Sequence, residues 1–144
     1  PIPLNQLARL KQRSDKINEL AQKSNSKYKR AVFIHVDSRS KKKQLDVFFY
    51  HAPKSASGEK LAKTMRTTFN EHYAKHQPSR GFSGTVSARD LYVLKNTTPV
   101  GLFAELGNIQ NGFDQRRILQ ADNRQALANW LCRGFIKDFK NQKK

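Results

Sequence analysis

Apolar residues recur at helical spacing in three parts of the chain. Between residues 4 and 20, four leucines and Ile17 return every three or seven positions, with Lys, Arg and Gln between them. This pattern predicts an amphipathic helix that ends near Lys23. Residues 59–75 and 123–139 show the same period and predict two further helices. Their expected inward positions are Leu61, Met65 and Phe69 in the first, and Leu127, Trp130, Leu131 and Phe135 in the second.

Four short segments have no helical period and predict strands. Residues 31–36 (AVFIHV) form a nearly continuous apolar run, which is typical of a strand buried on both faces of a parallel sheet. The other three are residues 45–51, 91–95 and 100–106. Residues 77–88 are expected to form a long loop. Because strands alternate with helices, we predict an α/β fold with a mostly parallel sheet flanked by helices.

The chain shows no internal repeat and no linker, so residues 1–144 are expected to form a single domain. Lys and Arg number 28 against 11 Asp and Glu, which gives a net charge of +17. Such a charge favours anionic partners: nucleic acid, a membrane surface or a bacterial wall polymer. The basic residues are spread along the chain, so a solvated surface accounts for most single lysines.

Two partner classes are disfavoured by the absence of their usual patterns. No apolar run approaches the roughly 20 residues of a membrane span. No helix-turn-helix, RRM or zinc-finger pattern accompanies the basic residues, which disfavours nucleic acid.

The single cysteine, Cys132, rules out an intramolecular disulfide and leaves the redox compartment open.

Candidate chemistry lies at the ends of two predicted strands. His35 ends the first apolar strand and Glu105 ends the last one. If these strands are neighbours in a parallel sheet, both side chains open into one cleft. A neutral imidazole can bind zinc, and a carboxylate can accept a proton from water. Other interpretations stay open: a strand histidine is more often a hydrogen-bonded core residue, and a glutamate there is more often an ion-pair partner.

The remaining histidines and the cysteine are weaker candidates. His72 and His76 have the i, i+4 spacing of a two-histidine metal site, but no glutamate lies between them, so we interpret them as exposed helix residues. His51 is a further possible ligand at the end of its strand. Cys132 follows Trp130 and Leu131 on a helix, which favours a buried structural thiol over a nucleophile.

Four segments, taken in order, resemble a known family. LKQRSDKIN (residues 10–18) looks like an L-x-x-R-x-x-x-x-N helix, and VFIHVDS (32–38) looks like an S-I-H-x-[ND]-[AS] strand with Phe33 at the serine position. Residues 90–119 look like V-L-[RK]-x-x-x-x-P-x-x-L-x-E-x-G-x-x-x-N-x-x-D, of which the E-x-G-x-x-x-N-x-x-D part fits position by position, and residues 123–135 look like the closing helix. The sequence is therefore similar to the zinc-dependent N-acetylmuramoyl-L-alanine amidases of bacterial cell-wall turnover.

The resemblance implies a role for each candidate residue. Glu105 matches the family's catalytic carboxylate, which acts in cleavage of the amide between N-acetylmuramic acid and L-alanine, and His35 matches its last zinc-binding histidine. It further implies zinc as cofactor, peptidoglycan as partner, and a periplasmic or secreted, wall-associated location. The basic surface would suit stem-peptide carboxylates and the phosphates of anionic wall polymers.

The sequence departs from the family pattern in its ligand set. The family uses His, Glu and His, and the first two precede the L-x-x-R-x-x-x-x-N helix with which this chain begins. The chain thus resembles the C-terminal two-thirds of an amidase domain, lacking its first strand and helix, and we expect one zinc ligand of three. The favoured expectation is part of an active amidase. The alternative is a non-catalytic basic module that binds wall polymer or nucleic acid on an amidase-like scaffold.

Overall fold

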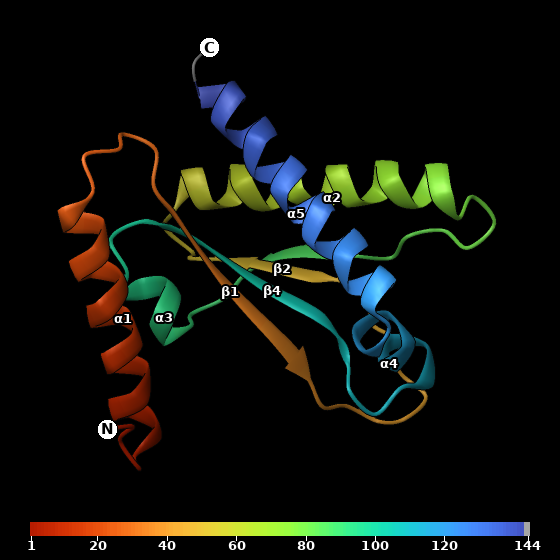
Figure 1. The fold of residues 1–144 in the computed structure, drawn as a ribbon, viewed down its shortest axis with the longest axis horizontal. Coiled ribbons are helices and arrows are strands. Elements are labelled where there is room, and N and C mark those ends of the chain that lie inside the picture. Colours follow the sequence, from red (N-terminus) through yellow and green to blue (C-terminus); the bar gives the residue numbers. More distant parts are fainter. Residues whose placement is uncertain (143–144) are drawn as a thin grey trace.

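The computed structural model describes residues 1–142 (Figure 1). Its helices are α1 (Gln6–Lys23), α2 (Ala56–His76), α3 (Tyr92–Lys95), α4 (Gly112–Leu119) and α5 (Ala121–Gln142), and its strands are β1 (Arg30–Asp37), β2 (Phe48–His51), β3 (Thr85–Ala88) and β4 (Val100–Asn108). Within these residues, no helix is both long and apolar enough to cross a membrane.

The four strands form one mixed sheet in the order β1-β4-β2-β3. β1 runs parallel to β4, and β2 runs parallel to β3, while β2 and β4 are antiparallel. Two of the three pairings are therefore parallel, which confirms the predicted α/β class with a mostly parallel sheet. In Figure 1, α2 and α5 lie together on one side of the sheet, and α1 and α3 lie together on the other.

The larger hydrophobic core lies between the sheet and the pair α2 and α5. The predicted inward residues of α2, Leu61, Met65 and Phe69, are fully buried, and they pack with Phe49 of β2 and Leu102 of β4. Burial of each such side chain favours folding by roughly 1.5–3 kcal/mol. In α5, Leu127 and Leu131 are buried, while Trp130 and Phe135 are partly buried against the same core.

Gly134 allows the two helices of this layer to approach closely. A Cβ atom at this position would lie 2.2 Å from Sδ of Met65 and 3.6 Å from its Cα. Because atoms cannot approach that closely, a larger residue would force α2 and α5 apart or displace Met65 from the core.

The opposite face of the sheet carries a smaller core with a thinner cover. Leu10 and Ile17 of α1 pack against Phe33 and Phe103 of the sheet. The predicted helical boundary at Lys23 is confirmed. The remaining leucines of the amphipathic stripe, Leu4, Leu7 and Leu20, are exposed by 96%, 60% and 55%. The apolar face of α1 is thus wider than the surface that covers it.

Asn18, the last position of the L-x-x-R-x-x-x-x-N segment, fastens α1 to the turn before β4. Its Nδ2 donates to the carbonyl of Asn96 at 2.9 Å, and its Oδ1 accepts from the backbone N–H of Thr98 at 2.8 Å. This pair of bonds fixes the position of the helix relative to the sheet.

The predicted strand at residues 91–95 is wrong, because Tyr92–Lys95 forms helix α3. Its adjacent side chains Val93 and Leu94 are both buried in the smaller core, and a helical turn lets neighbouring positions face one surface better than a strand does. The true strand, β3, lies in the expected loop at residues 77–88. It is a mostly exposed strand, so it carries no apolar signal.

The prediction that the first strand is buried on both faces is also wrong. In β1, Ala31 and Phe33 are buried under α1 and α3, whereas Val32, Ile34 and Val36 on the other face are exposed by 41%, 55% and 40%. The reason is the position of β1. It is an edge strand of the described sheet, and α2 and α5 do not cover it.

Candidate functional site

His35 and Glu105 lie side by side at the carboxyl ends of β1 and β4. They are direct register partners in the parallel ladder, and they project to the same face as Phe33 and Phe103. The His35 ring stacks on Phe103 with centroids 4.3 Å apart and planes 20° apart. The structure therefore brings the two candidate residues together, as neighbouring parallel strands require.

His35 is an exposed residue, although its ring is partly covered by Phe103, and its environment favours the neutral form. Partial burial, and then the nearby charge of Arg13, hold the pKa of His35 below its ordinary value. A neutral imidazole is the form that can bind a metal or accept a proton.

The carboxylate of Glu105 is held in an unusual environment for a charged group. Glu105 is 7% exposed, and among the described residues its Oε2 accepts no hydrogen bond. The nearest cation is Arg39, whose Nη2 lies 3.6 Å from Oε2. Burial, and then repulsion by Asp37, raise the pKa of Glu105, while Arg39 and Arg89 oppose that rise. A carboxyl group with a raised pKa is well suited to exchange a proton near neutral pH.

Arg39 belongs to the loop at residues 38–47, which follows β1 and borders Glu105. It forms an ion pair with Asp37, and its guanidinium lies 5.4 Å from the centre of the Phe48 ring. Phe48 is itself the register partner of Glu105 on the antiparallel side. The loop thus places one guanidinium between two carboxylates at the strand ends.

Asn108 holds this loop through its side chain. It is fully buried, and its Oδ1 accepts from the backbone N–H groups of Arg39 at 3.0 Å and Gln110 at 3.1 Å. Its Nδ2 donates to the carbonyls of Ser40 at 2.9 Å and Lys43 at 2.8 Å. One amide therefore uses its full bonding capacity to close the loop onto the end of β4.

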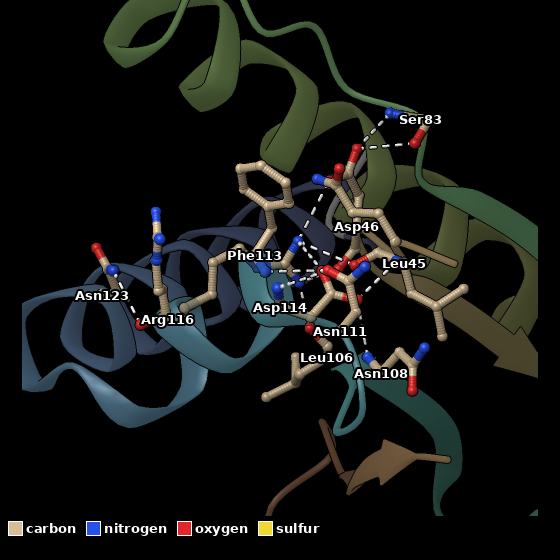
Figure 2. Close-up of polar contacts among 12 residues, drawn as sticks. Leu45, Asp46, Ser83, Leu106, Asn108, Asn111, Phe113, Asp114, Arg116 and Asn123 are labelled. Carbon is tan, nitrogen blue, oxygen red and sulfur yellow. Dashed lines mark hydrogen bonds and ion pairs between the residues drawn. The ribbon is translucent and has the colours of Figure 1, made fainter. Parts of the chain in front are cut away.

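The E-x-G-x-x-x-N-x-x-D spacing has a physical explanation in the turn from β4 to α4 (Figure 2). Asn111 caps α4 by accepting from the N–H groups of Phe113 and Asp114. The fully buried Asp114 accepts from the N–H of Leu45 at 2.7 Å and of Asn108 at 2.9 Å. At Gly107, a Cβ would come within 3.1 Å of the Cβ of Asp114, so a larger residue would require Asp114 to shift by a few tenths of an ångström.

A second buried carboxylate, Asp46, joins β2 to α4 (Figure 2). It is 4% exposed, accepts from the N–H and Oγ of Ser83 at 2.7 and 2.8 Å, and forms ion pairs with Arg80 and Arg117. Burial alone would raise the pKa of Asp46, but the hydrogen bonds from Ser83 and the charge of Arg80 outweigh it and lower the pKa. Sequence reasoning did not identify this group or Asn108; polar residues directly flanking apolar strands are the signal that could have found them.

The other histidines lie away from this pair. His51 is 6% exposed at the opposite end of the antiparallel pairing, and its Nδ1 lies 2.9 Å from the carbonyl of Ala52. His76 is exposed on α2 as predicted, whereas His72 is half-buried because its ring stacks on Trp130.

The prediction of a buried thiol at Cys132 is wrong. Cys132 is exposed because the buried stripe of α5 runs through Leu127, Leu131, Gly134 and Asp138. One residue beyond Leu131, the helix has turned by about 100°, which places the thiol on the outer face.

The site residues described here do not form a complete metal site. Among residues 1–142, no group of three or more His, Cys, Asp or Glu side chains could hold a metal ion. His35 is the single imidazole beside Glu105, and the closest charge to that carboxylate is the guanidinium of Arg39. Catalytic zinc sites use three protein ligands, so this donor set alone does not fit zinc.

Comparisons with known proteins relate this geometry to one family. A sequence model of the N-acetylmuramoyl-L-alanine amidases matches residues 5–137. No curated protein sequence matches the chain. Among solved structures, an N-acetylmuramoyl-L-alanine amidase from Clostridium difficile 630 superposes with a TM-score of 0.73 at 18% identity, covering 91% of this chain and 65% of its own.

Two other structures give the same relationship. The amidase AmiC2 of Nostoc punctiforme has a TM-score of 0.67 at 22% identity and covers 85% of this chain and 63% of its own. The catalytic domain of CwlV from Bacillus (Paenibacillus) polymyxa has a TM-score of 0.69 at 20% identity, with coverages of 92% and 65%. The chain thus spans less than two-thirds of each of these relatives, with which it shares the fold. Since the family match extends over nearly the whole sequence, the chain belongs to the N-acetylmuramoyl-L-alanine amidase family.

Proposed function

We propose that this chain forms part of the catalytic domain of a zinc-dependent peptidoglycan amidase. The reaction is hydrolysis of the amide between N-acetylmuramic acid and L-alanine, in cell-wall remodelling. The observation that carries the proposal is the pair of register partners His35 and Glu105, with a nearly buried carboxylate of raised pKa, at the strand ends of a family member.

In this proposal Glu105 is the group that exchanges a proton during the reaction. Its raised pKa makes both the charged and the protonated form accessible closer to neutral pH than for an ordinary glutamate. Arg39, fixed by Asp37 and by the loop that Asn108 closes, positions the carboxylate from 3.6 Å away. The stack on Phe103 orients the ring of His35, which serves as one metal ligand.

The remaining zinc ligands would come from residues outside those described. The exposed face of β1, with Val32, Ile34 and Val36, supports this part of the proposal, because it is an uncovered apolar surface on the strand that carries His35. We propose that residues 1–144 are one part of a single amidase domain, and that a further segment of that domain covers this face.

The net charge of +17 supports a location at the bacterial wall, in the periplasm or outside the cell. A cationic surface concentrates a protein on polymers that carry carboxylates and phosphates. The rival is a non-catalytic binding module on the same scaffold, which the single imidazole at the site favours.

The test is substitution of Glu105 in the full-length polypeptide. Glu105→Gln should lower the rate of peptide release from muropeptides by about 10²–10⁴-fold, the range expected for general acid–base catalysis. Glu59→Gln, which removes an exposed acid on α2, is the matched control and should keep the wild-type rate. A folded Glu105→Gln protein with more than half the wild-type rate would remove Glu105 from the mechanism. A full-length wild type with no activity and normal folding would favour the binding module.

The zinc assignment is tested separately by metal content. His35→Ala should lower zinc occupancy of the full-length polypeptide, and the isolated 144-residue chain should bind zinc weakly in equilibrium dialysis. Tight stoichiometric zinc that depends on His72 or His76 would place the metal on α2 and contradict the assignment of His35.

A further inference from the structure

A separate hollow lies among the helices on the side of the sheet opposite His35 and Glu105. It has a volume of about 580 Å³, within the roughly 300–1,000 Å³ that is usual for ligand sites, and is formed by α2, α4 and α5. Its charged and aromatic lining residues include His72, His76, Arg80, Arg117, Trp130 and Arg133. Family membership and the amidase proposal give no role to this hollow.

One wall of the hollow is a layer of three nearly parallel rings. Trp130 stacks on His72 with centroids 5.4 Å apart and planes 11° apart, and His76 continues the layer 6.1 Å from His72 at 3°. Trp130 and His72 are half-buried, and His76 is exposed. A flat, partly exposed aromatic surface of this kind suits the apolar face of a sugar ring.

The hollow is positively charged. No aspartate or glutamate is among its lining residues within the described chain. Arg133 is exposed and makes no ion pair within residues 1–142, so its guanidinium is available to a ligand. The pKa of His72 reflects the same field, because burial and then the charge of Arg133 lower it.

The floor of the hollow is rigid because its two inner arginines are held from below. Arg80 and Arg117 both pair with the buried Asp46, and Arg80 also lies 4.6 Å from the centre of the Tyr73 ring. Two amide side chains, Asn123 and Asn129, line the same hollow and can bond to hydroxyl groups. The ring layer, the fixed guanidinium groups of the floor, the unpaired guanidinium of Arg133 and the amides together form a site for a ligand that carries both hydroxyls and negative charge.

We propose that this hollow binds an anionic sugar or polyol unit of a wall glycopolymer, with the ring layer of Trp130, His72 and His76 as the contact surface and Arg133 as the charge partner. The choice of a wall polymer rests on the proposed function, whereas binding itself does not need catalysis. Nucleic acid is disfavoured because it requires a groove that follows many phosphates, and this site is a single hollow between three helices.

Trp130 is the only tryptophan in the chain, so its fluorescence reports on this site alone. The full chain is titrated with soluble poly(glycerol phosphate), and in parallel with single-stranded DNA, at the same ionic strength. We expect a saturable change in Trp130 emission with the polymer. Arg133→Ala should weaken that binding by about tenfold, as loss of one charged hydrogen bond does.

The matched control is Lys60→Ala, which removes one exposed cation at the other end of α2. It should change affinity by less than about twofold, since it does not line the hollow. Equal weakening by the two variants would overturn the proposal in favour of diffuse attraction. Tighter Arg133-dependent binding of DNA would overturn it in favour of nucleic acid, and an unresponsive Trp130 would place polymer binding elsewhere. The assay does not involve hydrolysis. A protein that binds the polymer as expected but has no amidase activity would therefore refute the amidase proposal and leave the binding proposal standing.

Discussion

Substitution of Asn108 by alanine should destabilise the protein well beyond what an ordinary polar-to-alanine change does. The side chain is fully buried and makes four hydrogen bonds, to the backbone of Arg39, Ser40, Lys43 and Gln110. Each contributes about 0.5–1.5 kcal/mol net, and a buried group left unpaired costs about 1–3 kcal/mol. Because the loop is partly exposed, water can replace some bonds, and we expect a loss of about 2–4 kcal/mol.

The measurement is equilibrium urea denaturation of the wild type and variant, with Asn129→Ala as control. Asn129 is exposed, so its substitution should change the free energy of unfolding by less than about 0.5 kcal/mol. Asn108→Asp keeps the acceptor and removes the two donated bonds, so it separates the contribution of the accepted hydrogen bonds from that of the donated ones. A loss below about 1 kcal/mol for Asn108→Ala would refute the conclusion that this amide holds the loop.

Two further predictions concern buried contacts outside the loop. Gly134→Ala should lower the free energy of unfolding by about 1–3 kcal/mol, because its Cβ would lie 2.2 Å from Sδ of Met65. Gly112→Ala is the control, since a Cβ there would have no atom within 4 Å. Equal urea midpoints for the two variants would contradict the close helix contact. Asp46 has a lowered pKa, so its stabilisation is present above the ordinary value of 3.8 and is lost as pH falls through the folded pKa. Asp46→Asn should therefore show a shallower loss of stability between about pH 5 and pH 2 than the wild type, and parallel curves would exclude Asp46 from the acid response.

The parts of the fold that sequence patterns predicted well are those in which one face of an element is fully buried. Leu61, Met65 and Phe69 kept the helical period because α2 packs along much of its length against the sheet. The proximity of His35 and Glu105 followed from a different rule: each ends an apolar strand, and parallel neighbours bring their carboxyl ends to one edge. Their chemical roles stay predictions.

The parts of the fold that sequence patterns could not predict depend on which helices cover which strands. Val93 and Leu94 are apolar neighbours, and Val93 and the preceding Tyr92 favour a strand, but burial of the pair against the smaller core selects a helical turn. Val86 lies in a mostly exposed strand whose sequence resembles a loop. Asp46 and Asn108 act on backbone groups as many as 69 residues away, and no local pattern encodes such partners.

The outward face of β1 has a consequence for the behaviour of this polypeptide in solution. An edge strand with free backbone groups and exposed Val32, Ile34 and Val36 is a ready template for pairing with another copy. Charge repulsion at +17 opposes such self-association, and salt weakens that repulsion. Preparations of the isolated chain should thus stay dispersed at low ionic strength and aggregate through this strand as salt is added, and a lysine in place of Ile34 should suppress the effect.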